Sequence, residues 1–261
     1  MGAGALAVRK GLHTMPEPFE EFPATTRLEY APIPNGLPEP VERYLRVVAG
    51  DVLPVTRTAV LGGRMSMRIK GPALPGRWRF SHVVGAGYRH YMEVGAFGRR
   101  FTTGQEWYLD GHARLDLPMG LVENEPKVDR AANLSMWGEY LWLPSALVDP
   151  RARWEPIDVV SARLVVPQAD GPDTLVAWFD PQTSLVERFE AMRWRDVGDP
   201  EPLRWVTRIH AWTRIGGIGV PAVTSVQWGD QSQPWLRLSL DDVVWNAEID
   251  DYLRGGGARG F

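Results

Sequence analysis

Residues 126–150, PKVDRAANLSMWGEYLWLPSALVDP, decide the fold, because they carry the longest helical pattern and separate two groups of strand-like segments. Leu134, Trp137 and Leu141 recur at intervals of three and four residues and so form one apolar stripe. Other apolar side chains extend this surface almost around the helix, namely Met136, Tyr140 and Leu143. A helix that is apolar on nearly all sides is buried.

The ends of this helix are predicted from two residues. Asp129 is the expected N-cap, because its carboxylate can accept hydrogen bonds from the free amides of the first turn. Pro144 limits the helix at the other end. We therefore expect a helix over residues 129–143. A shorter amphipathic helix is expected over residues 38–49, with Gly50 as its stop.

On both sides of the central helix the apolar period changes to two, which indicates antiparallel strands with one buried face. Before the helix, Tyr88, His90 and Met92 alternate with polar residues, and Asp110-Gly111 predicts a tight hairpin turn. After the helix, strands are expected near residues 158–166, 174–179, 185–195, 204–214, 220–228, 234–240 and 243–249.

These patterns predict a mainly β fold of the α+β class. A large curved antiparallel sheet, or half-barrel, would carry the hydrophobic helix on its concave side. The alternative is a two-sheet sandwich with the helix at one end. We expect a single domain over residues 37–252, an apolar and Pro-rich tether over residues 1–36, and a flexible Gly-rich tail over residues 253–261.

Composition excludes several functions. The net charge of −3 gives no basic field for a nucleic-acid backbone. With no cysteine, the chain has no disulfide, thiolate nucleophile or cysteine metal site. The 12 tryptophans and 22 prolines favour a β-rich fold of short segments with an aromatic interior.

Glu139 is the strongest candidate for a functional residue. A carboxylate on a nearly all-apolar helix is costly to bury without a partner, and burial raises its pKa toward values useful in acid–base catalysis. The structural alternative is an ion pair or hydrogen bond with a side chain from a strand, since buried charges are usually paired.

The five histidines show no His-x-x-x-His or His-Glu-x-x-His spacing, so a metal site would need ligands from separate strands. His82 and His90 lie on neighbouring predicted strands and could converge with Glu139. A buried histidine with one hydrogen bond is nevertheless commoner than a ligand, so we predict neither a metal nor a cofactor. No nucleophile elbow or phosphate-binding loop is present.

Arginines follow the polar faces of three successive predicted strands, at positions 64, 68, 77, 79 and 89. They could form a cationic surface for acidic headgroups. The other interpretation is a solvated sheet face interleaved with Glu93 and Glu106.

Several blocks of the chain resemble a bacterial family that is defined only as a domain of unknown function. They are residues 37–45, 87–91, 107–115, 125–129, 139–147, 154–158 and 243–246. The resemblance covers nearly all of residues 37–252. It implies an architecture similar to that of lipoprotein carriers of the LolA and LppX type, which are half-barrels that hold acylated or lipid ligands. Members often carry an N-terminal membrane helix.

The N-terminal residues give an indication of the cellular location of the protein. Residues 2–8 are apolar and are followed by Arg9 and Lys10, but this stretch is too short to span a bilayer, which needs about 20 apolar residues. Together with the resemblance, it suggests an extracytoplasmic domain associated with a membrane through its N-terminus. A cytoplasmic protein is the alternative.

The favoured function is non-enzymatic binding or carriage of a hydrophobic ligand, a lipid or acyl chain, in the half-barrel cavity. The expected ligand-binding residues are Met136, Trp137, Glu139, Trp142, Arg89 and His90. The alternative is an enzyme of unknown reaction with Glu139 as general acid or base and His90 or Arg89 orienting the substrate. The oligomeric state stays open.

Overall fold

The protein was analysed as a computed structural model, which describes residues 12, 21–23, 28–68 and 71–254. Its main feature is one antiparallel sheet of 13 strands. Strands that precede the central helix form the first half: β3 (Thr58–Met67), β4 (Leu74–Val83), β5 (Gly87–Ala96), β6 (Arg99–Leu109), β7 (His112–Leu117) and β8 (Gly120–Glu123). The second half follows the helix and holds β9 (Arg153–Asp158), β10 (Ser161–Val166), β11 (Asp173–Phe179), β12 (Val186–Arg193), β13 (Leu203–Ile215), β14 (Ile218–Trp228) and β15 (Leu236–Trp245).

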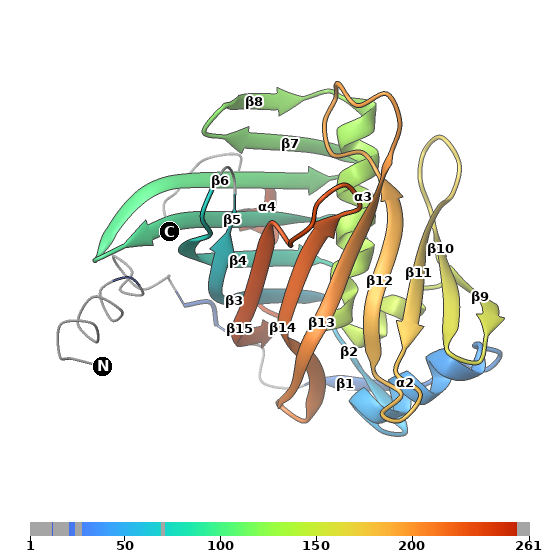
Figure 1. The fold of residues 1–261 in the computed structure, drawn as a ribbon. Helices are drawn as coiled ribbons and strands as arrows, with labels where there is room; N and C mark the ends of the chain where they lie inside the picture. Colours follow the sequence, from blue (N-terminus) through green and yellow to red (C-terminus); the bar gives the residue numbers. More distant parts are fainter. Residues whose placement is uncertain (1–11, 13–20, 24–27, 69–70, 255–261) are drawn as a thin grey trace.

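The strand order is β8-β7-β6-β5-β4-β3-β15-β14-β13-β12-β11-β10-β9. Each half is thus a meander, and the two halves join where β15 pairs with β3. Figure 1 shows that the strands of the two halves run crosswise, so the sheet curves strongly. The predicted curved antiparallel sheet is confirmed, and the sandwich alternative is wrong.

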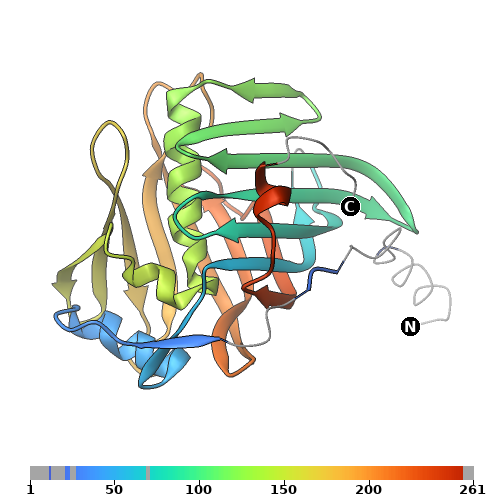
Figure 2. The same ribbon diagram turned by 180° about the vertical axis from the view of Figure 1, so that it is seen from behind.

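The central helix α3 (Pro126–Glu139) lies on the concave side of this sheet. It contacts β6 and β7 in the first half and β11 and β12 in the second, so it fills the angle between them. Figure 2 shows it from behind, running along the strands of the second half and across the ends of the strands of the first half. Two short 3-10 helices continue the chain, η1 (Tyr140–Trp142) and η2 (Pro144–Val148).

The predicted N-cap was wrong. The helix begins three residues before Asp129, because Pro126 has the fixed φ that suits a first helical residue and Glu125 before it is extended. The Asp129 carboxylate instead accepts a hydrogen bond from the Ala113 amide at 2.6 Å, which ties the helix to β7.

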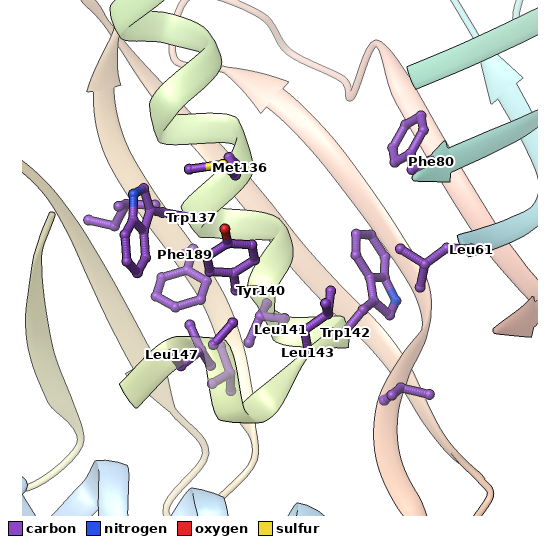
Figure 3. Packing of buried hydrophobic residues seen from close by; sticks show 14 of the residues in the cluster. Leu61, Phe80, Met136, Trp137, Tyr140, Leu141, Trp142, Leu143, Leu147 and Phe189 are labelled. Carbon is purple, nitrogen blue, oxygen red and sulfur yellow. The ribbon is translucent and has the colours of Figure 1, made fainter. Parts of the chain in front are cut away.

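The apolar residues of this segment form the centre of the core (Figure 3). Trp137 is 1% exposed and makes an edge contact with Tyr140 at 5.1 Å between ring centroids, on the side of Phe189. Trp142 lies on the opposite side, toward Leu61 and Phe80. Its indole nitrogen donates to the Pro221 carbonyl at 2.9 Å, so it fixes the end of the helix to β14.

The second predicted helix is also present, as α2 (Glu39–Ala49), and its chain turns at Gly50 with a φ of 85°. Just before it, β1 (Glu29–Pro32) pairs with β2 (Val52–Val55) in a separate two-stranded sheet. The segment expected to act as a tether therefore contains a strand. The division of the chain into tether, domain and tail stays a prediction.

The strand predictions were confirmed in type and corrected in detail. Asp110 and Gly111 form the β6–β7 turn, both with positive φ, as a tight hairpin requires. The two strands expected over residues 234–249 are one strand, β15, because a bulge between Leu240 and Asp242 shifts its register. Strands β8 and most of β9 were not predicted.

A short helix, α4 (Asp250–Arg254), packs on the outer side of β4 and β5. It changes the surroundings of the arginines there, since Arg77, Arg79 and Arg89 are at most 8% exposed. The Arg89 guanidinium lies 4.4 Å from the ring centroid of Tyr252, which belongs to α4. Both predictions of an exposed arginine face are wrong for these three residues. Rings from distant parts of the chain lie against Arg79 and Arg89, and Arg77 pairs with the buried Glu93.

Some expectations fall on residues that the structure does not describe. They are the apolar residues 2–8 with their basic flank and the Gly-rich tail after residue 254, and both lie outside the described residues. In the described part of the chain, none of the helices combines the length and the hydropathy needed to span a bilayer.

Candidate functional site

A cavity of about 460 Å³ lies between the two halves of the sheet and the C-terminal half of α3. It is open on one side, and apolar side chains form most of its wall. The first half of the sheet contributes Met65, Met67, Phe80, Met92, Val94, Leu115 and Leu117, and the second half contributes Trp205, Val226, Trp228, Leu236 and Leu238. Trp142 and Leu141 close the end next to the helix.

One group of ionisable side chains interrupts the apolar wall. Glu139, the last residue of α3, meets two histidines from adjacent strands. Its Oε2 atom lies 2.8 Å from His90 Nε2 and 3.2 Å from His82 Nε2. The exposed fractions of the side chains are 16% for Glu139, 4% for His90 and 0% for His82. The cluster therefore lies at the inner end of the cavity, where Glu139 and His90 line it.

The register of β4 and β5 brings the two histidines together. Phe80 pairs with His90 and His82 pairs with Tyr88, so the histidines are diagonal neighbours on the same face. The His90 ring stacks between Phe80, at 3.7 Å between centroids, and Tyr88, at 4.0 Å. These two rings hold the imidazole in one orientation, with Nε2 toward the helix.

The electrostatics of the cluster follow from burial and proximity. Burial raises the pKa of Glu139, but the two neighbouring histidines outweigh it and lower this pKa to about 2. Glu139 is therefore ionised at neutral pH and accepts a hydrogen bond from His90 Nε2. Burial is the main cause that lowers the pKa of His82, and the nearby Glu139 carboxylate opposes this effect.

A second polar contact lies beside this cluster. The Tyr88 hydroxyl donates to Glu106, which also lines the cavity. Burial, together with the Glu106 carboxylate, raises the pKa of Tyr88 well above its ordinary value. Farther out, Arg193 lies over the rings of Trp205 and Trp228, at 5.3 and 5.4 Å from their centroids. The cavity thus offers both carboxylates and a cation among its apolar walls.

The structure places the residues expected at the site in three different locations. Glu139, His90 and Trp142 line the cavity. Trp137 and Met136 are buried in the core behind the helix and do not line it. Arg89 lies on the convex face, where its guanidinium contacts Trp107 at 4.9 Å from the ring centroid and donates to Gln105.

Several cavity residues were not identified from the sequence. Trp205, Trp228 and Trp235 come from β13, β14 and the loop before β15 and line the cavity together with Met65 and Met92. Their large apolar side chains are a signal for burial, but this signal does not distinguish a cavity wall from a packed core.

The fold and the site define a class of protein: a β half-barrel that encloses a largely apolar cavity with a polar cluster at its inner end. The chain belongs to the family of unknown function DUF6544, which matches residues 28–238. No curated protein sequence matches the chain.

Solved structures of similar outline include two bacterial proteins. A LolA superfamily protein from Nitrosomonas europaea is 10% identical and has a TM-score of 0.48, with 78% of this chain and 91% of that chain covered. A DUF1329 family protein from Desulfovibrio piger is 12% identical and has a TM-score of 0.47, with 82% and 93% covered.

Proposed function

We propose that this protein binds and carries an apolar ligand, such as the acyl chain of a lipid, in the half-barrel cavity. The observation that carries the proposal is the open cavity of about 460 Å³ with mostly apolar walls. Small-molecule sites generally occupy about 300–1,000 Å³ and combine apolar walls with a few polar groups. This cavity has both properties.

The kinds of side chain in the wall also support an acyl ligand. Met65, Met67 and Met92 are unbranched and flexible, so they can adapt to a chain that has no fixed shape. Burying apolar surface supplies about 25 cal/mol per Å², without the directional contacts that a rigid polar substrate would need.

An enzyme with Glu139 as general acid or base is the second candidate, because Glu139 and His90 face the same cavity. Efficient acid–base catalysis needs a pKa near the working pH. The histidines lower the pKa of Glu139 to about 2, far below that range. An ionised Glu139 could not act as a general acid, which favours the carrier over acid catalysis.

Tryptophan fluorescence provides a test, since Trp142, Trp205, Trp228 and Trp235 line the cavity. Dibromostearate is expected to quench the fluorescence in a saturable way, because its bromine atoms would lie against these rings. Stearate, which carries no bromine, is expected to displace it and restore the signal. Quenching that does not saturate, or that stearate does not reverse, would count against a bound acyl chain.

Gly104→Leu tests whether the ligand enters this cavity. Gly104 lines it, and an added Cβ would meet only the end of the Leu117 side chain, at 3.4 Å. The leucine is expected to fill part of the cavity and weaken dibromostearate binding at least about 10-fold, or about 1.4 kcal/mol. Gly62→Leu is the control, because Gly62 does not line the cavity and its added Cβ would meet nothing nearer than 3.7 Å. Equal affinities of the two variants would contradict the proposed site.

The same proposal places the domain outside the cytoplasm, at a membrane that supplies the ligand. Support comes from the apolar cavity and from the family resemblance of the sequence. Alkaline phosphatase fused to the C-terminus of the natural full-length protein is expected to be active, since this enzyme matures only after export. An inactive fusion present at normal levels would favour the cytoplasm.

A further inference from the structure

We propose that His82, His90 and Glu139 bind one divalent transition-metal ion of the zinc class at the inner end of the cavity. The three side chains each offer one ligand atom, and no two of these atoms are farther apart than 4.8 Å. Two imidazoles and one carboxylate are a ligand set that zinc and other divalent transition metals take in proteins.

The distances within the cluster fit a shared ion. Zinc lies about 2.0–2.2 Å from histidine nitrogens and carboxylate oxygens, so ligand atoms at octahedral to tetrahedral angles lie about 2.8–3.6 Å apart. The Glu139 Oε2 atom is 2.8 Å from His90 Nε2 and 3.2 Å from His82 Nε2. Small shifts of the side chains would therefore admit an ion between them.

His82 supplies an independent observation. It is fully buried, yet neither of its ring nitrogens has a hydrogen-bond partner among the described residues. Its Nε2 atom lies near the Glu139 oxygen but out of line for a hydrogen bond. Buried polar atoms are rarely left without a partner. The hydrogen bond between Glu139 and His90 leaves the electron pair of His82 Nε2 unused. A metal ion would be bound by this electron pair.

The surrounding residues hold the metal-binding side chains in place and leave one side of the site open to the cavity. His90 is fixed between two aromatic rings, and Glu139 is carried by the end of a buried helix. Fixed ligands reduce the reorganisation that binding requires. Because Glu139 and His90 line the cavity, the remaining coordination positions of the ion would face it. With three protein ligands the site would be open to the cavity, unlike the closed four-ligand sites of structural zinc.

The test measures the metal alone, on tag-free protein freed of ions with a chelator. Titration calorimetry with Zn²⁺ is expected to show one ion per chain. Glu139→Gln and His90→Gln each remove one ligand, so each is expected to weaken binding by at least about 100-fold, more than the 10- to 100-fold typical of outer-shell partners. His112→Gln is the control, since His112 is 82% exposed and lies outside the cluster. It is expected to bind zinc as the natural chain does.

A second readout separates binding from damage to the fold. Co²⁺ is expected to give visible absorption bands with the natural chain and with His112→Gln, and to lose them with both cluster variants. Thermal unfolding without metal checks that each variant is folded. Zinc affinity that is equal in the natural chain and in both cluster variants would overturn the site, as would a natural chain that takes up neither ion. None of these outcomes depends on whether the cavity holds a lipid.

Discussion

Trp137→Ala is expected to lower the free energy of unfolding by about 3–5 kcal/mol, as large-to-small changes of buried aromatic residues do. Trp137 is 1% exposed in α3, and its ring makes an edge contact with Tyr140 on the side of Phe189. Alanine would leave a cavity between the helix and the second half of the sheet, which the surrounding strands cannot close. Urea unfolding followed by circular dichroism measures the change.

The control for Trp137→Ala is Met192→Ala, because Met192 is an apolar residue of β12 that is 59% exposed. Its replacement is expected to change stability by less than about 0.5 kcal/mol. Trp137 does not line the cavity, so the folded Trp137→Ala protein is expected to keep its affinity for dibromostearate. If Trp137→Ala lowered the free energy of unfolding as little as Met192→Ala does, the helix would not be the centre of the core.

Arg77→Ala is expected to cost about 3–5 kcal/mol, the usual cost of removing one partner of a buried ion pair. Arg77 Nε lies 2.6 Å from Glu93 Oε1, and the Glu93 side chain is fully buried. The Tyr91 hydroxyl donates to the other oxygen of Glu93 at 2.8 Å. Without Arg77, the buried charge of Glu93 would be compensated only in part, by the Tyr91 hydroxyl and by the Arg100 guanidinium at 3.9 Å. Thermal or urea unfolding at neutral pH measures the loss.

A double-mutant cycle separates the charge effect from lost packing. Arg77→Met with Glu93→Gln removes both charges and keeps similar side-chain lengths, so the pair of changes is expected to cost less than Arg77→Ala alone. Arg64→Ala is the control, because Arg64 and Asp241 form a pair that is 64% and 47% exposed and such pairs contribute about 0–1 kcal/mol. A double variant less stable than Arg77→Ala would contradict the explanation by buried charge.

The sequence predicts the architecture well, because local periodicity is enough to assign most elements. The three- and four-residue spacing of Leu134, Trp137 and Leu141 identifies the helix, and period-two segments on both sides identify the sheet. The errors arise where one residue interrupts a pattern. Pro126 starts the helix earlier than Asp129 suggests, and the bulge after Leu240 makes one bent strand look like two.

The site is less predictable, since it depends on register between strands. Glu139 and the two histidines are visible in the sequence as candidates, but their meeting depends on the pairing of Phe80 with His90. The burial of Arg89 depends on Tyr252, 163 positions later in the chain. No local pattern reports a contact of that kind. The sequence also does not show which face of the helix lines the cavity, so Trp137, on the face away from it, looks as suitable for ligand binding as Trp142.

The position of β15 has a consequence for how the chain reaches this structure. Strands β3 and β15 are neighbours in the large sheet but lie far apart in the sequence. In all other neighbouring pairs of this sheet, the two strands follow one another along the chain. Each meander can therefore form from contacts that are short in sequence, which close at low entropic cost. The pairing of β3 with β15 joins residues 58–67 to residues 236–245 and must wait for almost the whole chain. During synthesis on the ribosome, β3 stays an open sheet edge until the last tenth of the protein emerges, and an open edge is the kind of surface on which chaperones and aggregation compete.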